Sequence, residues 1–228
     1  MQKVKTLVIL FFLTVASSLT YSQDIVPMKS ADRFMIGFFT DVWSDLPPGM
    51  DTKAINRGIT IDMMQDFPLG NSNFSLGLGL GYMGQNLYSD NYLYTLLEGN
   101  YEFVEIDEGV VVEKSKLSLN YLQIPFEVRF RTRNLPENLR IHLGARAGLL
   151  VNAHNKYLGG DLEGLSDKER KFKESKLGNV EQFNFGVLAR VGYSRFNIFA
   201  YMPLMPVFED NNAEDASFFS VGLTFIVF

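Results

Sequence analysis

Few side chains in this 228-residue sequence could perform catalysis. His142 and His154 are its only histidines, and the sequence contains no cysteine. The lack of cysteine excludes disulfides, thiolate zinc sites, iron–sulfur clusters and cysteine nucleophiles. A histidine can act as a general acid or base, but no Gly-x-Ser-x-Gly turn or other nucleophile motif accompanies either one. We therefore predict that the protein is not an enzyme and uses no cofactor.

Acidic residues gather in two segments where oxygen ligands could hold a hard cation such as calcium. One segment spans residues 98–108 and the other spans residues 209–215. Calcium loops place their ligands at regular intervals, and neither segment has that spacing. We interpret both as solvated loops and predict no metal site.

A third group of candidates consists of charged residues that alternate with apolar ones. Charges that share an enclosed face are tolerated only when they are paired and hydrogen-bonded. The predicted members of an ionic network on this face are Asp62, Glu127, Arg129, Arg146 and Arg190. Arg131 and Arg140 follow the same pattern beside a turn at 134–138, where we expect them to be hydrated. With these two the face has five arginines but only two acids, so the predicted pairing is incomplete.

The elements that must position these residues are strands with a period of two. In residues 73–85, Phe and Leu alternate with Ser and Gly, which places apolar side chains on one face. Residues 122–131, 139–149 and 183–193 alternate as clearly. Less regular alternation occurs at 33–43, 55–66, 195–206 and 216–228. Together these segments predict eight strands.

Glycine indicates which face is enclosed. Gly77, Gly79 and Gly81 belong to the face that elsewhere carries long Arg and Glu side chains. Small and long side chains together can fill a narrow bore, whereas exposed glycines would only weaken strands. We therefore place the charged face in the lumen and the Phe/Leu face against lipid. The predicted fold is all-β, an eight-stranded antiparallel up-and-down transmembrane β-barrel.

The termini and connections predict the location. Lys3 and Lys5, the apolar run 7–13 and small residues up to Ser22 are typical of a secretory signal peptide, which we assign to residues 1–22. Residues 23–228 then form one barrel domain. Long segments (44–54, 86–116, 156–179 and 207–215) alternate with short turns, as in outer-membrane barrels with long outer loops. We predict an outer-membrane location, contact with outer-membrane lipid and, from the net charge of −5, no nucleic-acid partner.

One segment resembles a known family. Leu119-Asn120-Tyr121-Leu122-Gln123-Ile124-Pro125 is similar to the Leu-x-Tyr-Leu-x-Ile-Pro strand of the PorT-like outer-membrane β-barrel family. The resemblance implies an eight-stranded outer-membrane barrel and, through the name-giving member, a component of a protein-secretion apparatus. Because proline cannot donate a ladder hydrogen bond, we expect a bulge at Pro125 and strand ends at Pro203 or Pro206. The last strand leaves two registers open, one ending on Phe228 and one with Phe219 to Val227 on the apolar face.

Two principal functions agree with these features. In the first, the barrel has a structural or interaction role in the cell envelope, with envelope or secretion-system proteins as partners. In the second, it is a pore or transporter for small solutes, although eight strands leave a bore that side chains fill. A third, more remote alternative is a lipid-acting enzyme, which would need an open cleft beside His154.

Overall fold

The computed structural model describes residues 33–44, 52–53, 55–89, 91–95, 101–106, 110–133, 137–161, 169–175, 177, 180–208 and 217–227. Its elements are all strands: β1 (Phe34–Ser44), β2 (Arg57–Pro68), β3 (Phe74–Tyr88), β4 (Asn91–Thr95), β5 (Tyr101–Glu105), β6 (Val112–Arg131), β7 (Leu139–Gly159), β8 (Arg170–Ser175), β9 (Phe183–Tyr193), β10 (Phe196–Pro203) and β11 (Ser217–Val227). In this described part, no helix is long and apolar enough to span a bilayer. The predicted signal peptide lies outside the described residues.

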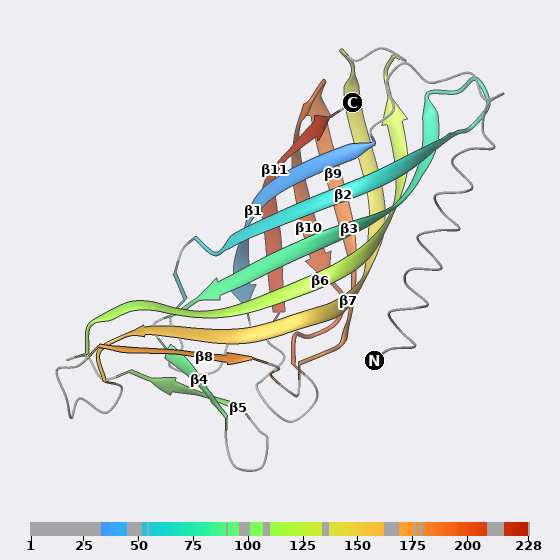
Figure 1. The fold of residues 1–228 in the computed structure, drawn as a ribbon. Coiled ribbons are helices and arrows are strands. Elements are labelled where there is room, and N and C mark those ends of the chain that lie inside the picture. The colour runs from blue at the N-terminus through green and yellow to red at the C-terminus, as the bar shows by residue number, and fades with distance from the viewer. Residues whose placement is uncertain are drawn as a thin grey trace.

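Eight of these strands form a closed antiparallel barrel. The sheet runs in the order β6-β3-β2-β1-β11-β10-β9-β7-β8, and pairing of β6 with β7 closes it. β8 adds to the edge of β7 outside the ring, while β4 and β5 form a separate two-stranded sheet. Figure 1 shows the barrel strands wrapping around a single bore, with β8, β4 and β5 beyond one end. The predicted all-β, eight-stranded, up-and-down fold is confirmed.

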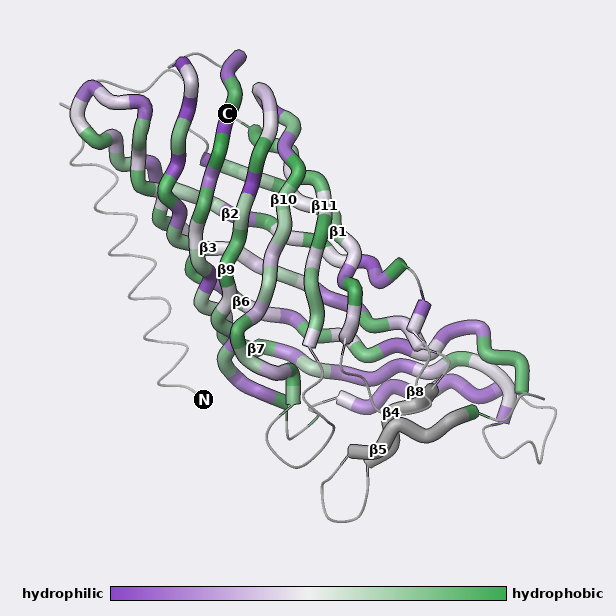
Figure 2. Tube along the Cα trace, turned by 180° about the vertical axis from the view of Figure 1, so that it is seen from behind, coloured by the Kyte–Doolittle hydropathy of each residue, from purple (hydrophilic) through white to green (hydrophobic). Residues whose placement is uncertain are grey.

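Side chains alternate between the bore and the outer surface. The prediction that the charged face lines the lumen and the Phe/Leu face points outward is confirmed. Along β9, Asn184, Gly186, Leu188 and Arg190 are buried, whereas the intervening apolar residues are exposed. Figure 2 shows this alternation as green and purple bands along the strands. Large apolar side chains on the outside and charged ones inside are the reverse of a water-soluble barrel, and they suit a lipid environment.

The two ends of the barrel have different connections. Short turns at 69–73 and 194–195 join strands at the end that also holds the start of β1 and the end of β11. At the other end the segments between strands are long. Here the sequence prediction is corrected, because parts of the expected loops 86–116 and 156–179 form strands. β6 begins at Val112 and β7 ends at Gly159, so both continue past the barrel wall and join β8 in a three-stranded extension.

The predicted bulge at Pro125 is wrong. The ladder between β3 and β6 skips Pro125, but its register is the same on both sides, with Leu78 opposite Phe126 and Gly81 opposite Gln123. Pro125 therefore removes a hydrogen-bond donor without inserting a residue. The β6–β7 ladder has two irregularities instead, one between Val112 and Lys114 and one in β7, where Asn120 pairs with Asn152 and the next residue of β6, Tyr121, pairs with Leu150. The extra residue, Val151, reverses which side chains of β7 point inward.

The last strand keeps one register along its described length. β11 pairs with β1 from Phe34↔Val227 to Ser44↔Ser217 without a shift. Its exposed residues are Phe219, Val221, Leu223, Phe225 and Val227. The second of the two sequence-based registers is therefore confirmed, while Phe228 lies outside the described residues. β10 ends at Pro203, as one of the two expected strand ends.

Candidate functional site in the barrel lumen

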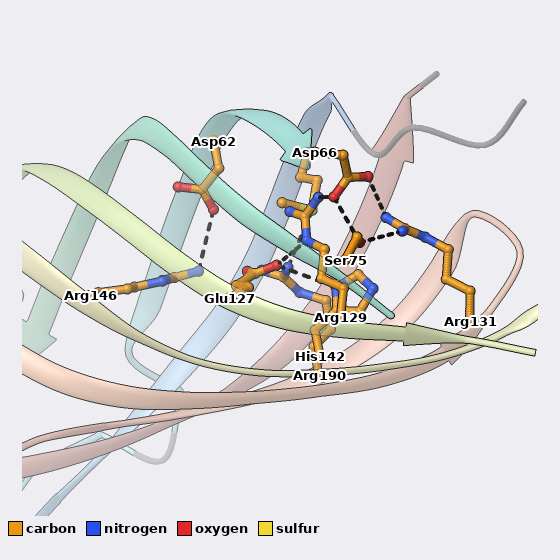
Figure 3. A network of polar contacts seen from close by, with 10 residues as sticks. Asp62, Asp66, Ser75, Glu127, Arg129, Arg131, His142, Arg146 and Arg190 are labelled. Atoms are coloured by element: carbon orange, nitrogen blue, oxygen red, sulfur yellow. Dashed lines mark hydrogen bonds and ion pairs between the residues drawn. The ribbon is translucent and has the colours of Figure 1, made fainter. Parts of the chain in front are cut away.

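Glu127 lies at the centre of a buried ionic network. Its carboxylate accepts hydrogen bonds from Arg129 Nε and Arg190 Nη1, each at 2.8 Å, and lies 3.4 Å from His142 Nδ1. All four side chains are fully buried. Figure 3 shows them converging from β6, β7 and β9. A charge in such a place needs partners of opposite sign, and Glu127 has two arginines.

Asp66 extends the network toward the short-turn end. It accepts hydrogen bonds from Arg129 Nη1 at 2.8 Å and from Arg131 Nη2 at 2.5 Å. Arg131 also donates to Ser75 Oγ at 2.8 Å. Arg129 therefore bridges Glu127 on its own strand and Asp66 on β2, which ties two non-adjacent barrel strands together through the bore (Figure 3).

Asp62 forms a second ionic group. Its carboxylate accepts a hydrogen bond from Gln123 Nε2 at 2.6 Å and another from Arg146 Nη2 at 3.3 Å. The Arg146 guanidinium also lies 5.5 Å from the ring centre of Tyr201, within cation–π range. Arg146 therefore stands between the charged part of the lumen and an aromatic part.

The structure places all five predicted network residues in the lumen and distributes them over two separate ionic groups. Glu127 contacts Arg129 and Arg190, whereas Asp62 contacts Arg146. Asp66 was missed, although it has the same phase as Asp62 on β2. Arg131 was expected to be hydrated, yet it is 2% exposed and pairs with Asp66. Arg140 is buried too, and its Nε donates to Asn138 Oδ1 at 2.9 Å.

The outer half of the lumen is apolar, which the sequence reading did not anticipate. Phe39 and Phe199 pack edge to face at 5.8 Å, and Trp43 packs against Phe218. Beyond the barrel wall, Val180 and Phe208 form a bridge between two outer segments. These residues belong to one buried cluster with Met83, Leu87, Leu117, Leu119, Tyr121, Ala153, Leu177, Leu188, Tyr201 and Val207. Charged side chains thus fill the bore at one level, and hydrophobic side chains fill it at the other.

Another acid, Asp41, lies in this outer half and was also missed. It accepts hydrogen bonds from Ser220 Oγ at 2.5 Å and from Gln85 Nε2 at 3.3 Å. Asp41 has the inward phase of β1, but the irregular alternation at 33–43 hid it from the sequence reading. Its described hydrogen-bond partners are neutral, unlike those of Glu127 and Asp66.

Glycines make room for the charged side chains. A β-carbon on Gly77 would lie 2.7 Å from Arg129 Cζ, and one on Gly81 would overlap Asp62 Oδ1. A β-carbon on Gly148 would instead meet its neighbours at an ordinary 3.5 Å. Small residues therefore stand opposite the largest polar ones, in agreement with the glycine pattern that identified the lumen.

We expect Gly81→Ala to lower the free energy of unfolding by about 1–3 kcal/mol, the usual cost of overpacking. The added methyl group displaces the Asp62 carboxylate from Gln123 and Arg146. Urea unfolding of the refolded barrel, followed by the fluorescence of Trp43, measures the change. Gly148→Ala is the matched control, and an equal loss in both variants would contradict this explanation.

The two histidines lie in different surroundings. His142 is enclosed beside Glu127, and His154 Nδ1 lies 2.8 Å from Asn152 Oδ1 on the outward face of β7. Burial, followed by the charges of Lys173, Lys116 and Lys156, lowers the pKa of His154. The described residues contain no group of three or more His, Asp or Glu that could hold a metal. Most of both predicted acidic segments, 98–108 and 209–215, lies outside the residues whose side chains are described.

A closed antiparallel barrel with an apolar outer belt and polar side chains inside has the architecture of outer-membrane β-barrel proteins. The family model described as "Outer membrane protein beta-barrel domain" matches residues 34–209, and the chain belongs to this family. The protein is located in the outer membrane, as the sequence predicted.

A comparison with solved structures gives a distant match. Ail, the attachment invasion locus protein of Yersinia pestis, determined in complex with the heparin analogue sucrose octasulfate, is 12% identical with a TM-score of 0.38. The match covers 85% of this chain and 96% of that one. None of the curated proteins compared with the chain matches it.

We expect the refolded protein to migrate differently in gel electrophoresis before and after boiling in mild detergent. The physical reason is that the closed hydrogen-bonded ring and buried ion pairs resist the detergent at room temperature. Recovery of the mature protein as a soluble monomer without detergent would contradict the lipid-facing assignment.

Proposed function

We propose that the barrel is a closed membrane anchor that holds its extracellular extension as a contact surface for other envelope proteins. The observation that carries this proposal is the filled bore. Arg129, Arg140 and Arg190 are fully buried side chains, and an apolar cluster fills the outer half. A barrel without an open path has its usable surface on the outside, where β6, β7 and β8 project.

A component of a secretion assembly is the specific form of this proposal. The support is the resemblance of residues 119–125 to the PorT-like family. In the fold, this segment lies where β6 passes from the extension into the barrel wall, so it belongs to the part that joins anchor and contact surface.

Site-specific photo-crosslinking in cells tests the contact surface. A photoreactive amino acid at Val111, which is 76% exposed at the start of the extension, should yield a discrete protein adduct. The same group at Leu143, on the lipid-facing surface, is the control and should yield none. Mass spectrometry of the adduct then shows whether the partner belongs to a secretion system. Identical products at both positions would contradict the proposal.

Planar-bilayer recording tests the pore alternative. We expect no sustained conductance from the wild-type barrel, because two layers of side chains fill its bore. A stable nanosiemens-scale conductance would overturn the closed anchor and favour a small-solute transporter. The third candidate, a lipid-acting enzyme, would need an open cleft beside His154.

A further inference from the structure

Lysines gather on the outward face of the extension. We name Lys114, Lys116, Lys156, Lys171 and Lys173 the lysine array. Lys114 and Lys116 come from β6, Lys156 from β7, and the other two from β8. The strand registers place Lys116 opposite Lys156 and Lys156 opposite Lys173, so three ammonium groups form one row across three strands.

This arrangement is costly without a counter-charge. Like charges that face each other across paired strands destabilise a sheet. The surroundings of Lys116 show the effect: burial and then the charges of Lys114, Lys156 and Lys173 lower its pKa to about 8. The Nζ of Lys116 also donates to Asn86 Oδ1 at 2.5 Å and lies 5.8 Å from the Tyr88 ring centre.

Protection of a sheet edge explains only part of the array. Lysines on edge strands discourage pairing with other chains, and among the described strands β8 pairs with β7 alone. Lys116 and Lys156, however, lie in strands that are paired on both sides at these positions. Their placement needs another reason.

The array lies just above the membrane-facing belt. The outward side chains of β6 and β7 change from Leu122 and Leu149 to Asn120 and Asn152, which share a hydrogen bond of 3.4 Å. Lys116 is six residues beyond Leu122 along β6, about 15 Å along the barrel axis at the usual strand tilt. Lysine stems are flexible enough to carry their ammonium groups back toward the head-group layer.

We propose that the lysine array binds the phosphate groups of anionic lipid head groups in the outer leaflet of the outer membrane. The array lies on the same outward face as the lipid-facing belt, beyond the Asn120–Asn152 pair, and lysine is an effective phosphate ligand as a point charge. Bound phosphate would neutralise the facing ammonium groups of Lys116 and Lys156. The proposal requires only the outer-membrane location and is independent of the proposed contact with envelope proteins.

Native mass spectrometry of the refolded mature barrel in neutral detergent tests the proposal, with diphosphorylated hexa-acyl lipid A as the probe. Each basic residue near an anionic surface contributes about fivefold to affinity. We therefore expect Lys116→Gln/Lys156→Gln to lower lipid A affinity at least tenfold. Arg33→Gln/Arg133→Gln removes the same charge from exposed positions at the opposite end, and should change the affinity less than twofold.

Binding measurements with further variants and ligands distinguish a lipid site from its alternatives. Lys116→Arg/Lys156→Arg should retain binding, and lipid A stripped of its phosphates should bind as weakly to wild type as intact lipid A binds to the glutamine variant. Without lipid, the glutamine variant should be at least as stable as wild type, which excludes misfolding as the cause of lost binding. Unchanged affinity in that variant, or an equal loss in the opposite-end control, would overturn the proposal. Binding of inorganic phosphate with no preference for lipid A, or of an envelope protein in its place, would do so too.

Discussion

Glu127→Gln should lower the free energy of unfolding by about 3–5 kcal/mol, the cost of removing one partner from a buried ion pair. The carboxylate accepts hydrogen bonds from Arg129 and Arg190 at 2.8 Å each, and the three side chains have no exposure to solvent. Glutamine preserves the shape but leaves two buried guanidinium groups without this counter-charge. Urea unfolding in detergent micelles, followed by the fluorescence of Trp43, gives the value.

Two further variants make this result specific. Glu113→Gln removes one acid from an exposed position of the same strand and should change stability by no more than about 0.5 kcal/mol. Arg190→Met, combined with Glu127→Gln, should cost less than the sum of the two single changes, because the double variant removes both charges of one pair. Strict additivity would show that Glu127 and Arg190 do not stabilise each other.

Leu78→Arg should reduce membrane insertion strongly, because a cation on the lipid face near mid-bilayer costs about 2–4 kcal/mol. Leu78 points outward from β3, is 47% exposed, and lies opposite Gln65 and Phe126 in the neighbouring strands. Refolding into phosphatidylcholine vesicles, with the folded fraction read from the gel shift on boiling, measures the loss.

The matched control must be an exposed apolar residue outside the bilayer. Asn155 falls close to a loop expected from the sequence, but it is 2% exposed and lies inside β7, so it is unsuitable. Val111→Arg introduces the same side chain at a position that is 76% exposed. Equal folded fractions for Leu78→Arg and Val111→Arg would mean that the Phe/Leu face does not contact lipid.

The barrel could be predicted from the sequence because apolar and polar or small residues alternate along a strand wherever one face contacts lipid and the other lines a bore. The outward residues of β3, β6, β7 and β9 are all apolar through the belt, so their period of two is unbroken. The same phase places Asp62, Glu127 and three arginines in the lumen. Which of them pair depends on strand stagger around the ring, and this stagger is not encoded within any one strand.

The features that sequence reading missed have identifiable physical causes. The apolar outer half of the lumen makes both faces of β1 and β10 hydrophobic, which weakens the alternation at Phe39 and Phe199. The bulge at Val151 reverses the phase of β7, so the strand appeared to end near Leu149. Asp66 stands close to a turn, where a strand end is hard to define. Pro125 suggested a bulge, although a missing donor alone satisfies its geometry.

The two-level filling of the bore also bears on how such a sequence can change over evolutionary time. In the apolar half, exchanges among hydrophobic residues of similar volume usually cost less than about 1.5 kcal/mol, so single substitutions can accumulate one after another. In the ionic half, any single loss at Glu127, Arg129 or Asp66 removes two buried ion pairs at once and leaves the neighbouring charges with fewer partners. Divergence there must proceed through paired replacements. Relatives of this barrel should therefore drift quickly in the outer half of the bore and slowly, in coupled steps, in the other.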